Sequence, residues 1–275
     1  MQEDPHGRLD WRALDWKALT LAPAMVFVLS ACSPGGTSDD AAPETTTAPS
    51  GSPTSAADGS AATAQSTEPS TPKEPTMTRR QATALLARAT ADGDLATVKE
   101  ALANRPDLES RNDLGRTPLV VATKANRVAI ARALLEAGAD PNAKDDLEDS
   151  AFLYAGAEGL DEILELTLAH GADVSSINRY GGTALIPASE HAHVETVRIL
   201  IAAGVPVNHV NNLSWTALHE AIVLGDGSPR HVKVVEMLLE AGADPAIPDG
   251  DGVLPRRLAS DRGYQAIVDA IDRAR

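Results

Sequence analysis

The sequence predicts an all-α domain made of repeated pairs of short helices, preceded by a signal peptide and a disordered linker. Two observations support the helical repeats. Short motifs recur at a spacing of 33 residues from about residue 78 onward, and a period of this length is typical of stacked supersecondary units. Aromatic residues make up only 3% of the chain, whereas β sandwiches usually draw on aromatic and β-branched residues. We therefore expect helices that approach one another closely.

Charge and cysteine content exclude several classes of protein. The 275 residues include 24 Lys and Arg against 39 Asp and Glu, which gives a formal net charge of −15. Nucleic-acid-binding surfaces need concentrated Lys and Arg to displace counterions, so we expect no nucleic-acid partner. The single cysteine permits no intramolecular disulfide and no cysteine-based zinc cluster. The hydrophobic core alone must therefore stabilise the fold.

The N-terminal region has the pattern of an export signal. Residues 18–31 form an uncharged, mostly apolar stretch that follows three basic residues. Its 14 residues are too few to span a bilayer as a helix, which takes about 20, but they fit the apolar region of a secretory signal. The stretch ends in Leu29-Ser30-Ala31-Cys32, which resembles the bacterial lipobox, where cleavage precedes a lipid-modified cysteine. The resemblance implies a signal peptide at 1–31 and lipidation of Cys32; the alternative is a cysteine buried in an N-terminal helix.

Residues 32–77 are expected to be the lipidated cysteine and a disordered linker. Of the 45 residues from 33 to 77, 36 are Ser, Thr, Pro, Ala or Gly, and no large apolar residue precedes Met77. Such a segment cannot bury enough apolar surface to offset the entropy of ordering it. As a flexible coil it would have a root-mean-square span of about 35–40 Å.

Two markers define the repeats over residues 78–275. The first is Gly138-Ala139-Asp140, which recurs as Gly171-Ala172-Asp173, Gly204-Val205-Pro206 and Gly242-Ala243-Asp244. The second is Thr117-Pro118-Leu119, which recurs as Ser150-Ala151-Phe152, Thr183-Ala184-Leu185 and Thr216-Ala217-Leu218. Both markers keep the same phase, so each unit is expected to fold as one structural repeat.

Each unit predicts two helices. Thr117 can cap a helix whose first residue is Pro118, where a missing N–H has no consequence, so a short helix is expected up to about Lys124. Apolar residues from Val128 onward then lie at helical spacing, and a second helix should end at Gly138, the expected left-handed cap.

The period of 33 and the Thr-Pro-Leu start resemble those of ankyrin repeats. The resemblance covers about residues 79–275 and implies paired helices with β-hairpin fingers between repeats. It gives about five repeats and a C-terminal cap, at 79–111, 112–144, 145–177, 178–210, 211–248 and 249–275. Repeat five has five additional residues, Asp226 to Arg230, which are expected to form a protruding turn rather than to lengthen a helix.

Several positions depart from this pattern, and Ala151 and Ala217 replace the proline of the Thr-Pro-Leu start. Glu148 and Ser214 replace the finger glycine, so those two fingers are expected to be less regular. Gly156 lies within the first helix of repeat three and lowers its intrinsic helix stability by up to ~1 kcal/mol relative to alanine. Repeat three is therefore predicted to be the weakest unit.

Candidate catalytic residues are few. Glu190, His191 and His193 could form part of a metal site, which gives a metal-assisted hydrolase as the alternative function. The structural interpretation is favoured, because His193 holds the position that ankyrins commonly fill with the histidine of a Gly-His turn. His219 is likewise interpreted as a hydrogen-bonding spacer between repeats. No enzyme activity and no cofactor are expected.

Binding to a protein partner is the expected function. The concave face of an ankyrin stack consists of finger tips and first helices, and its side chains can vary without disturbing the core. Exposed Trp and Tyr are typical interface anchors, so Tyr180 and Trp215 are the first candidates. The full set of candidate partner-binding residues is Leu114, Arg116, Leu147, Asp149, Tyr180, Trp215, Glu190 and His191.

Together, these patterns predict a bacterial ankyrin-repeat lipoprotein. It would be exported, anchored to the cell envelope through Cys32, monomeric, and bound to a protein partner outside the cytoplasm. Two acyl chains on one residue satisfy the two signals that stable anchoring requires. The resemblance leaves open whether the partner is an envelope enzyme or a toxin that the protein neutralises.

Overall fold

The computed structural model describes residues 77–274. The proposed signal peptide, Cys32 and all of the linker before Met77 lie outside these residues. The described part contains helices in consecutive pairs, two for each repeat. They are α1 (Arg79–Asp92), α2 (Leu95–Ala103), α3 (Pro118–Lys124), α4 (Val128–Glu136), α5 (Ala151–Glu158), α6 (Asp161–Ala169), α7 (Leu185–Glu190), α8 (Val194–Ala202), α9 (Ala217–Val223), α10 (Pro229–Glu240), α11 (Pro255–Asp261) and α12 (Gln265–Arg273).

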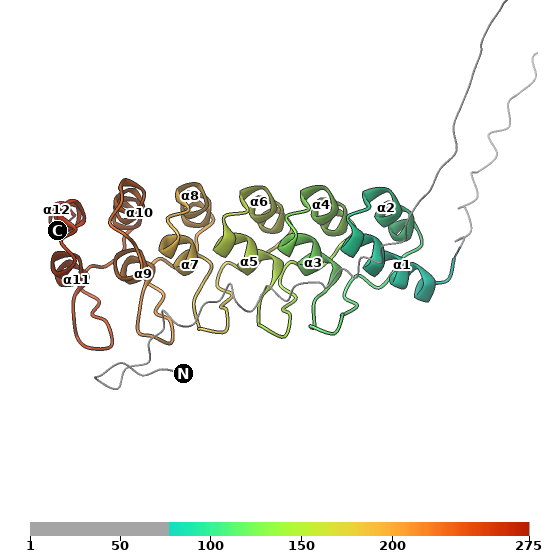
Figure 1. Cartoon of the computed structure of the whole chain (residues 1–275), viewed down its shortest axis with the longest axis horizontal. Helices are drawn as coiled ribbons and strands as arrows, with labels where there is room; N and C mark the ends of the chain where they lie inside the picture. Colours follow the sequence, from blue (N-terminus) through green and yellow to red (C-terminus); the bar gives the residue numbers. More distant parts are fainter. Residues whose placement is uncertain (1–76, 275) are drawn as a thin grey trace, which may run out of the picture. The chain divides into compact units, whose positions relative to one another are not determined.

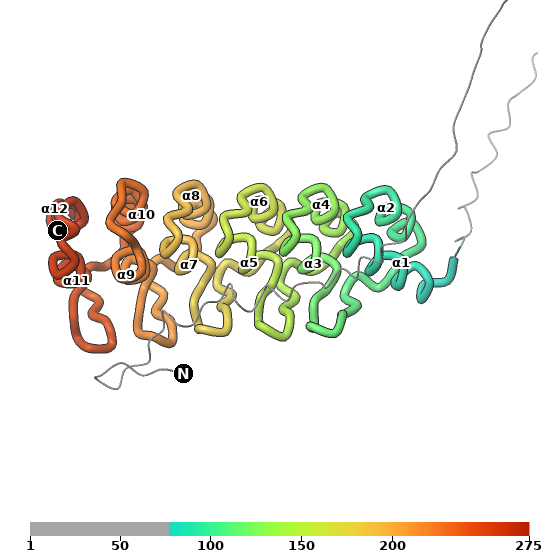
Figure 2. The backbone as a smooth tube through the Cα atoms, in the orientation of Figure 1, coloured from blue at the N-terminus to red at the C-terminus, as the bar shows by residue number. Residues whose placement is uncertain are grey.

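The repeats stack side by side in two layers of helices. The first helices of the repeats form one row and the second helices form the other, and the loops between repeats extend from the first row (Figure 1). Figure 2 shows these loops as a series of similar fingers along one side of the stack. The first helices and the fingers therefore share a continuous face.

Side-chain caps start several of the first helices where the sequence predicts them. Thr117 Oγ1 accepts a hydrogen bond from Val120 N at 3.3 Å, and Pro118 is the first residue of α3. Ser150 and Thr216 cap α5 and α9 in the same way. α4 ends just before Gly138, whose φ of 97° is left-handed. The predicted helices of repeat two are confirmed.

The core lies between the two helix layers and continues from repeat to repeat. Its largest fully buried side chains include Leu86, Leu119, Leu134, Phe152, Leu164, Leu185, Leu200, Leu218 and Leu238. Gly156 has a packing role here, because a Cβ at this position would lie 2.8 Å from the Cβ of Ala184. The glycine lets α5 and α7 approach closely.

The structure corrects two expectations about the loops. No strand is formed among residues 77–274, so the fingers are tight turns rather than β-hairpins. The additional residues of repeat five are shared between a turn and a helix, because α10 begins at Pro229 and has 12 residues where α8 has 9. The insertion therefore lengthens the second helix of repeat five, whereas the sequence analysis expected only a protruding turn.

Candidate partner-binding face

Each finger is built around an Asn or Asp side chain at its base. In repeat two, Asn112 Oδ1 accepts hydrogen bonds from the backbone N–H groups of Leu114 and Arg116, both at 3.0 Å. The backbone also closes the turn, since Asn112 N donates to Arg116 O at 3.1 Å. The equivalent base residues are Asp145, Asn178, Asn211 and Asp249. The finger backbone is thus held without any contribution from the tip side chains.

All five turns contain a residue with positive φ three positions after the base. Gly115 and Gly181 supply it in repeats two and four, and Gly252 supplies it in the C-terminal cap. Glu148 and Ser214 adopt it with φ of 60° and 62°. The prediction that these two fingers are less regular is wrong, because both keep the same closing hydrogen bonds. The non-glycine residues accept the strain of the left-handed conformation instead.

Neighbouring fingers are bonded to each other. Asp146 N donates to Leu114 O at 3.2 Å, and Asn212 N donates to Tyr180 O at 2.9 Å. Between the third and fourth repeats, Arg179 reaches Leu147 O at 3.5 Å. The tips therefore form an ordered row rather than a set of independent loops.

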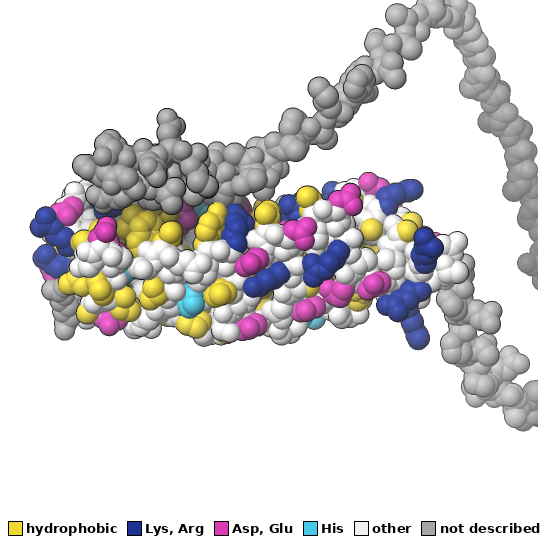
Figure 3. Space-filling view, turned by 90° about the horizontal axis from the view of Figure 1, so that it is seen from below, with side chains coloured by type: hydrophobic (Ala, Val, Ile, Leu, Met, Phe, Trp, Pro, Cys, Tyr) yellow, Lys and Arg dark blue, Asp and Glu magenta, His cyan; other side chains and the backbone are white. Residues whose placement is uncertain are grey.

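Large apolar side chains at the centre of the turns point into solvent. Leu114 is 53% exposed, Tyr180 40% and Leu213 47%, whereas Leu147 is half-buried. Viewed from below the fingers, hydrophobic side chains gather toward the C-terminal half of the stack (Figure 3). Ile177 and Val210 add to the exposed apolar residues of this half.

Trp215 differs from the expected tip residue. It is the closing residue of its finger, since Asn211 N donates to Trp215 O at 2.9 Å, and it is half-buried. The residue of repeat five that matches Tyr180 in register is Leu213, 33 positions later. Trp215 and Leu213 both remain candidates for partner contact, and Leu213 is the more exposed of the two.

Arg116 and Asp149 belong to a network of charges that joins repeats two, three and four. Asp145, whose side chain is 0% exposed, contacts Arg116 at 3.3 Å and Lys124 at 3.5 Å. Lys124 also contacts Asp149 at 2.6 Å, and Asp149 lies 3.8 Å from Arg179. These contacts give the two predicted binding residues a structural role within the stack.

Lys124 completes this network with an aromatic contact. Its ammonium lies 4.1 Å from the ring centroid of Tyr154, within the range of a cation–π interaction. Burial is the main cause that raises the pKa of the Tyr154 hydroxyl, followed by the charges of Glu158 and Asp149. The ring is therefore neutral and serves as a platform for Lys124.

A buried carboxyl group stabilises the base of finger five, and sequence reasoning missed it. Glu220 Oε1 accepts a hydrogen bond from Asn211 Nδ2 at 3.0 Å. Burial, followed by the nearby charge of Glu190, raises the pKa of Glu220 to about 8, although the hydrogen bond from Asn211 lowers it. Burial also raises the pKa of Glu190. Near neutral pH, Glu220 therefore holds its proton beside Asn211.

The contacts of the histidines support a structural role rather than a metal site among the described residues. The rings of His191 and His193 lie 5.6 Å apart, but the described residues hold no group of three His, Cys, Asp or Glu side chains that could bind a metal ion. His231 Nε2 bonds to Glu190 O at 2.9 Å and so links repeats four and five. His219 bonds to Thr216 within its own repeat, at 3.1 Å from Thr216 N to His219 Nδ1, so its interpretation as an inter-repeat spacer is wrong.

The repeated base residues carried a signal that the sequence analysis did not use. Asn112, Asp145, Asn178 and Asn211 recur every 33 residues, and Asn and Asp are the residues that bond to backbone groups two positions ahead. By contrast, no spacing in the sequence indicates that Glu220 is buried. Its position in the repeat holds Val121, Tyr154 and Pro187 in the other units.

Comparisons with known proteins agree on the family. The family model for ankyrin repeats (3 copies) matches residues 62–145 and 152–249. A putative ankyrin repeat protein of Escherichia coli K12, YahD, is 35% identical over 180 residues, which cover 65% of this chain and 90% of that protein.

Solved structures give the same result. The crystal structure of an ankyrin repeat domain from Acinetobacter baumannii AYE is 53% identical, with a TM-score of 0.68, over 69% of this chain and 96% of that one. The ankyrin repeat domain of Bcl-3, a member of the IkappaB protein family, is 27% identical, with a TM-score of 0.63, over 69% of this chain and 85% of that one. The chain belongs to the ankyrin-repeat family, whose members are generic protein–protein interaction modules.

Proposed function

We propose that this protein is a lipid-anchored binding protein that holds a partner protein outside the cytoplasm through its row of finger tips. The observation that carries the proposal is the exposure of Leu114, Tyr180 and Leu213 at the centres of their turns. Exposed large apolar side chains in an ordered row are typical of an interaction site.

The finger-tip side chains are free to contact a partner because the turns do not need them. Asn178 Oδ1 bonds to the backbone N–H of Tyr180, and Asn211 Oδ1 bonds to that of Leu213. Any residue except proline, which lacks the backbone N–H, would leave those bonds intact. Tyrosine is among the residues that contribute most to interfaces, and Leu213 adds exposed apolar surface on the neighbouring finger. These two side chains are therefore the proposed centre of the contact.

The anchor is proposed from the sequence. The Leu29-Ser30-Ala31-Cys32 ending supports lipidation of Cys32, and the composition of the segment up to Met77 supports a tether between the membrane and the repeats. None of the helices among residues 77–274 is both long and apolar enough to cross a membrane. The partner is proposed to be an envelope enzyme or a toxin.

Site-specific photocrosslinking in the native cell tests the binding face. A photoreactive amino acid would replace Tyr180 or Leu213 in the full chain, and Arg132, exposed on α4 in the other helix layer, is the matched control position. We expect the same crosslinked partner from both finger positions and none from position 132. A partner that crosslinks only from position 132 would contradict the proposed face.

Incorporation of a labelled fatty acid tests the anchor. The wild-type chain should incorporate the label and separate with membranes, whereas Cys32→Ala should do neither, because the attachment point is absent. Label that persists in Cys32→Ala would show that the lipid is attached elsewhere or that the anchor proposal is wrong.

A further inference from the structure

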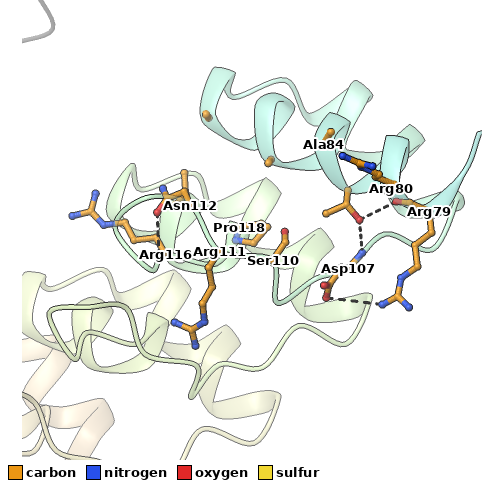
Figure 4. A pocket seen from close by; sticks show the side chains of 13 residues that line it. Arg79, Arg80, Ala84, Asp107, Ser110, Arg111, Asn112, Arg116 and Pro118 are labelled. Atoms are coloured by element: carbon orange, nitrogen blue, oxygen red, sulfur yellow. Dashed lines mark hydrogen bonds and ion pairs between the residues drawn. The ribbon is translucent and has the colours of Figure 1, made fainter.

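A groove with a basic lining lies at the N-terminal end of the finger face. It has a volume of about 750 Å³ and lies between α1, α3 and the segment from Asp107 to Asn112. Figure 4 shows α1 with Arg79 and Arg80 on one side and the segment with Asp107, Ser110 and Arg111 on the other. The full lining includes four arginines and one aspartate. The charge of this groove is therefore opposite to that of the chain, which carries −15.

The arginines of the groove are only partly neutralised. The Arg79 side chain is 72% exposed and meets Asp107 at a long distance of 4.0 Å. Arg80 forms no ion pair with any described residue. Arg111 donates to the carbonyl oxygens of Gly115 and Lys144, which carry no charge. Three guanidinium groups thus have no close carboxylate partner among the described residues.

Two of these arginines occupy positions that the fold does not favour. Arg79 and Arg80 are the first two residues of α1, and the first turn contains no acidic residue. Positive charges are unfavourable at a helix N-terminus, where the helix dipole favours Asp and Glu. Residues that are locally unfavourable and bring no compensating gain in stability are expected at functional positions.

The groove also offers an uncharged surface and an unused hydroxyl. Ala84, Ala87 and Ala91 line it with small side chains from α1, which leaves space for an extended backbone. The Ser110 hydroxyl is buried and has no hydrogen-bond partner among the described residues. A hydroxyl donates readily to a carboxylate, and arginine binds carboxylates with paired N–H groups.

We propose that this groove binds an acidic, extended segment of the partner protein through its carboxylates. Arg79, Arg80 and Arg111 would bind the carboxylates electrostatically, and Ser110 would donate a hydrogen bond to one of them. Asn112 and Arg116, which line the groove, also close the finger that carries Leu114. The acidic segment would therefore continue directly into the finger-tip contact. This inference rests on the proposed function for the partner, but its test does not need the partner.

Fluorescence anisotropy with a labelled octaglutamate peptide tests the groove in the full-length chain in detergent. We expect the acidic peptide to bind more tightly than an uncharged Gly-Ser peptide of equal length, although the chain as a whole is strongly acidic. Arg79→Glu combined with Arg80→Glu should weaken binding at least five-fold. The same variant should fold normally, because Glu is favourable in the first turn of a helix, and its thermal unfolding verifies this.

A matched variant separates the groove from the overall charge. Lys99→Glu combined with Arg132→Glu makes the same change in charge on exposed residues of α2 and α4, and we expect less than a two-fold effect. Ser110→Ala should weaken binding at least two-fold without any change in charge. Equal weakening in the two double variants, or no effect of Ser110→Ala, would overturn the site.

Two further outcomes keep this inference separate from the finger-tip proposal. Octaglutamate that binds no better than the Gly-Ser peptide overturns the groove, while crosslinking from Tyr180 and Leu213 would still stand. Binding that appears only after residues 35–73 are deleted would assign the groove to the chain's own segment and would overturn a partner as its occupant.

Discussion

The fingers of repeats three and five form the same backbone turn, but the base residue of each turn has different hydrogen-bond partners. In repeat three the base residue is Asp145, which forms ion pairs with Arg116 and Lys124. In repeat five the base residue is Asn211, whose amide donates to Glu220. Both bases accept hydrogen bonds of 2.9 and 3.0 Å from the N–H groups of their turn.

The comparison separates the side-chain atom that every turn requires from the atom that differs between repeats. The turn uses only Oδ1, which Asp and Asn both provide. The remaining atom decides the surroundings: Oδ2 of Asp145 needs donors, and cations supply them, whereas Nδ2 of Asn211 needs an acceptor, and Glu220 supplies it. The finger of repeat three is therefore held by charge pairs, and the finger of repeat five is held by a buried neutral acid.

Removal of the aspartate should have the largest effect on stability. Asp145→Ala removes two turn hydrogen bonds and leaves Arg116 and Lys124 without their shared anion, so we expect a loss of about 3 kcal/mol in the free energy of unfolding. Asp145→Asn keeps the turn acceptor and should lose less than half as much. Denaturant unfolding measures both. Equal losses would show that the charge pairs, rather than the turn, carry the whole effect.

A substitution at Gly156 tests the packing of repeat three against repeat four. Gly156→Ala would place a Cβ 2.8 Å from that of Ala184, and overpacking of this kind typically destabilises by about 1–3 kcal/mol. Helix propensity alone predicts the opposite sign, a gain of up to ~1 kcal/mol. The double variant Gly156→Ala with Ala184→Gly should recover most of the loss. A more stable single variant would contradict the close approach of α5 and α7.

The pH dependence of stability tests the neutral acid of repeat five. The folded protein holds the proton on Glu220 up to a pKa of about 8, whereas the unfolded chain releases it near the ordinary glutamate value. Between these values the folded state binds more protons, so stability falls as the pH rises from about 5 to 8. Glu220→Gln cannot ionise and should show a smaller fall.

Thermal unfolding at pH 5 and pH 8 provides the measurement. We expect the melting temperature of the wild type to fall by several degrees more than that of Glu220→Gln over this range. Asp145→Asn serves as the comparison in repeat three and should keep the pH dependence of Glu220. An identical fall in wild type and Glu220→Gln would show that Glu220 is ionised in the folded state.

The smallest expected effect concerns the two strained turns. Glu148 and Ser214 have φ of 60° and 62°, and glycine adopts this conformation without the penalty that other residues incur, about 1 kcal/mol. Glu148→Gly and Ser214→Gly should each raise the free energy of unfolding by up to this amount, because the turn has no other need for the side chain. Denaturant titration of both variants checks it, and a loss of stability in either would assign that side chain a contact of its own.

The sequence predicted most of the fold because its signals are local. A capping Thr117, a first-turn Pro118 and the left-handed Gly138 act within a few residues of the helix ends that they define, and the 33-residue period repeats them. The exposure of Tyr180 also follows from its register. These features need no knowledge of distant contacts.

The sequence could not predict features that depend on contacts between repeats. Gly156 has a low helix propensity, so the sequence alone indicates a weak position in α5. Only the distance to Ala184 shows that the glycine permits close packing. Glu220 resembles any surface glutamate until the fold buries it beside Asn211. The arginine groove requires α1 to face the segment around Ser110, which no local pattern indicates.

The most direct test of the binding face is the affinity of the crosslinked partner for a double finger variant. Tyr180→Ala with Leu213→Ala should weaken binding at least ten-fold, since truncated interface anchors commonly cost ~2 kcal/mol or more each. Its thermal unfolding should match that of Lys99→Ala with Arg132→Ala, because exposed residues contribute less than about 0.5 kcal/mol to stability. Unchanged affinity in the finger variant, with normal folding, would contradict the account.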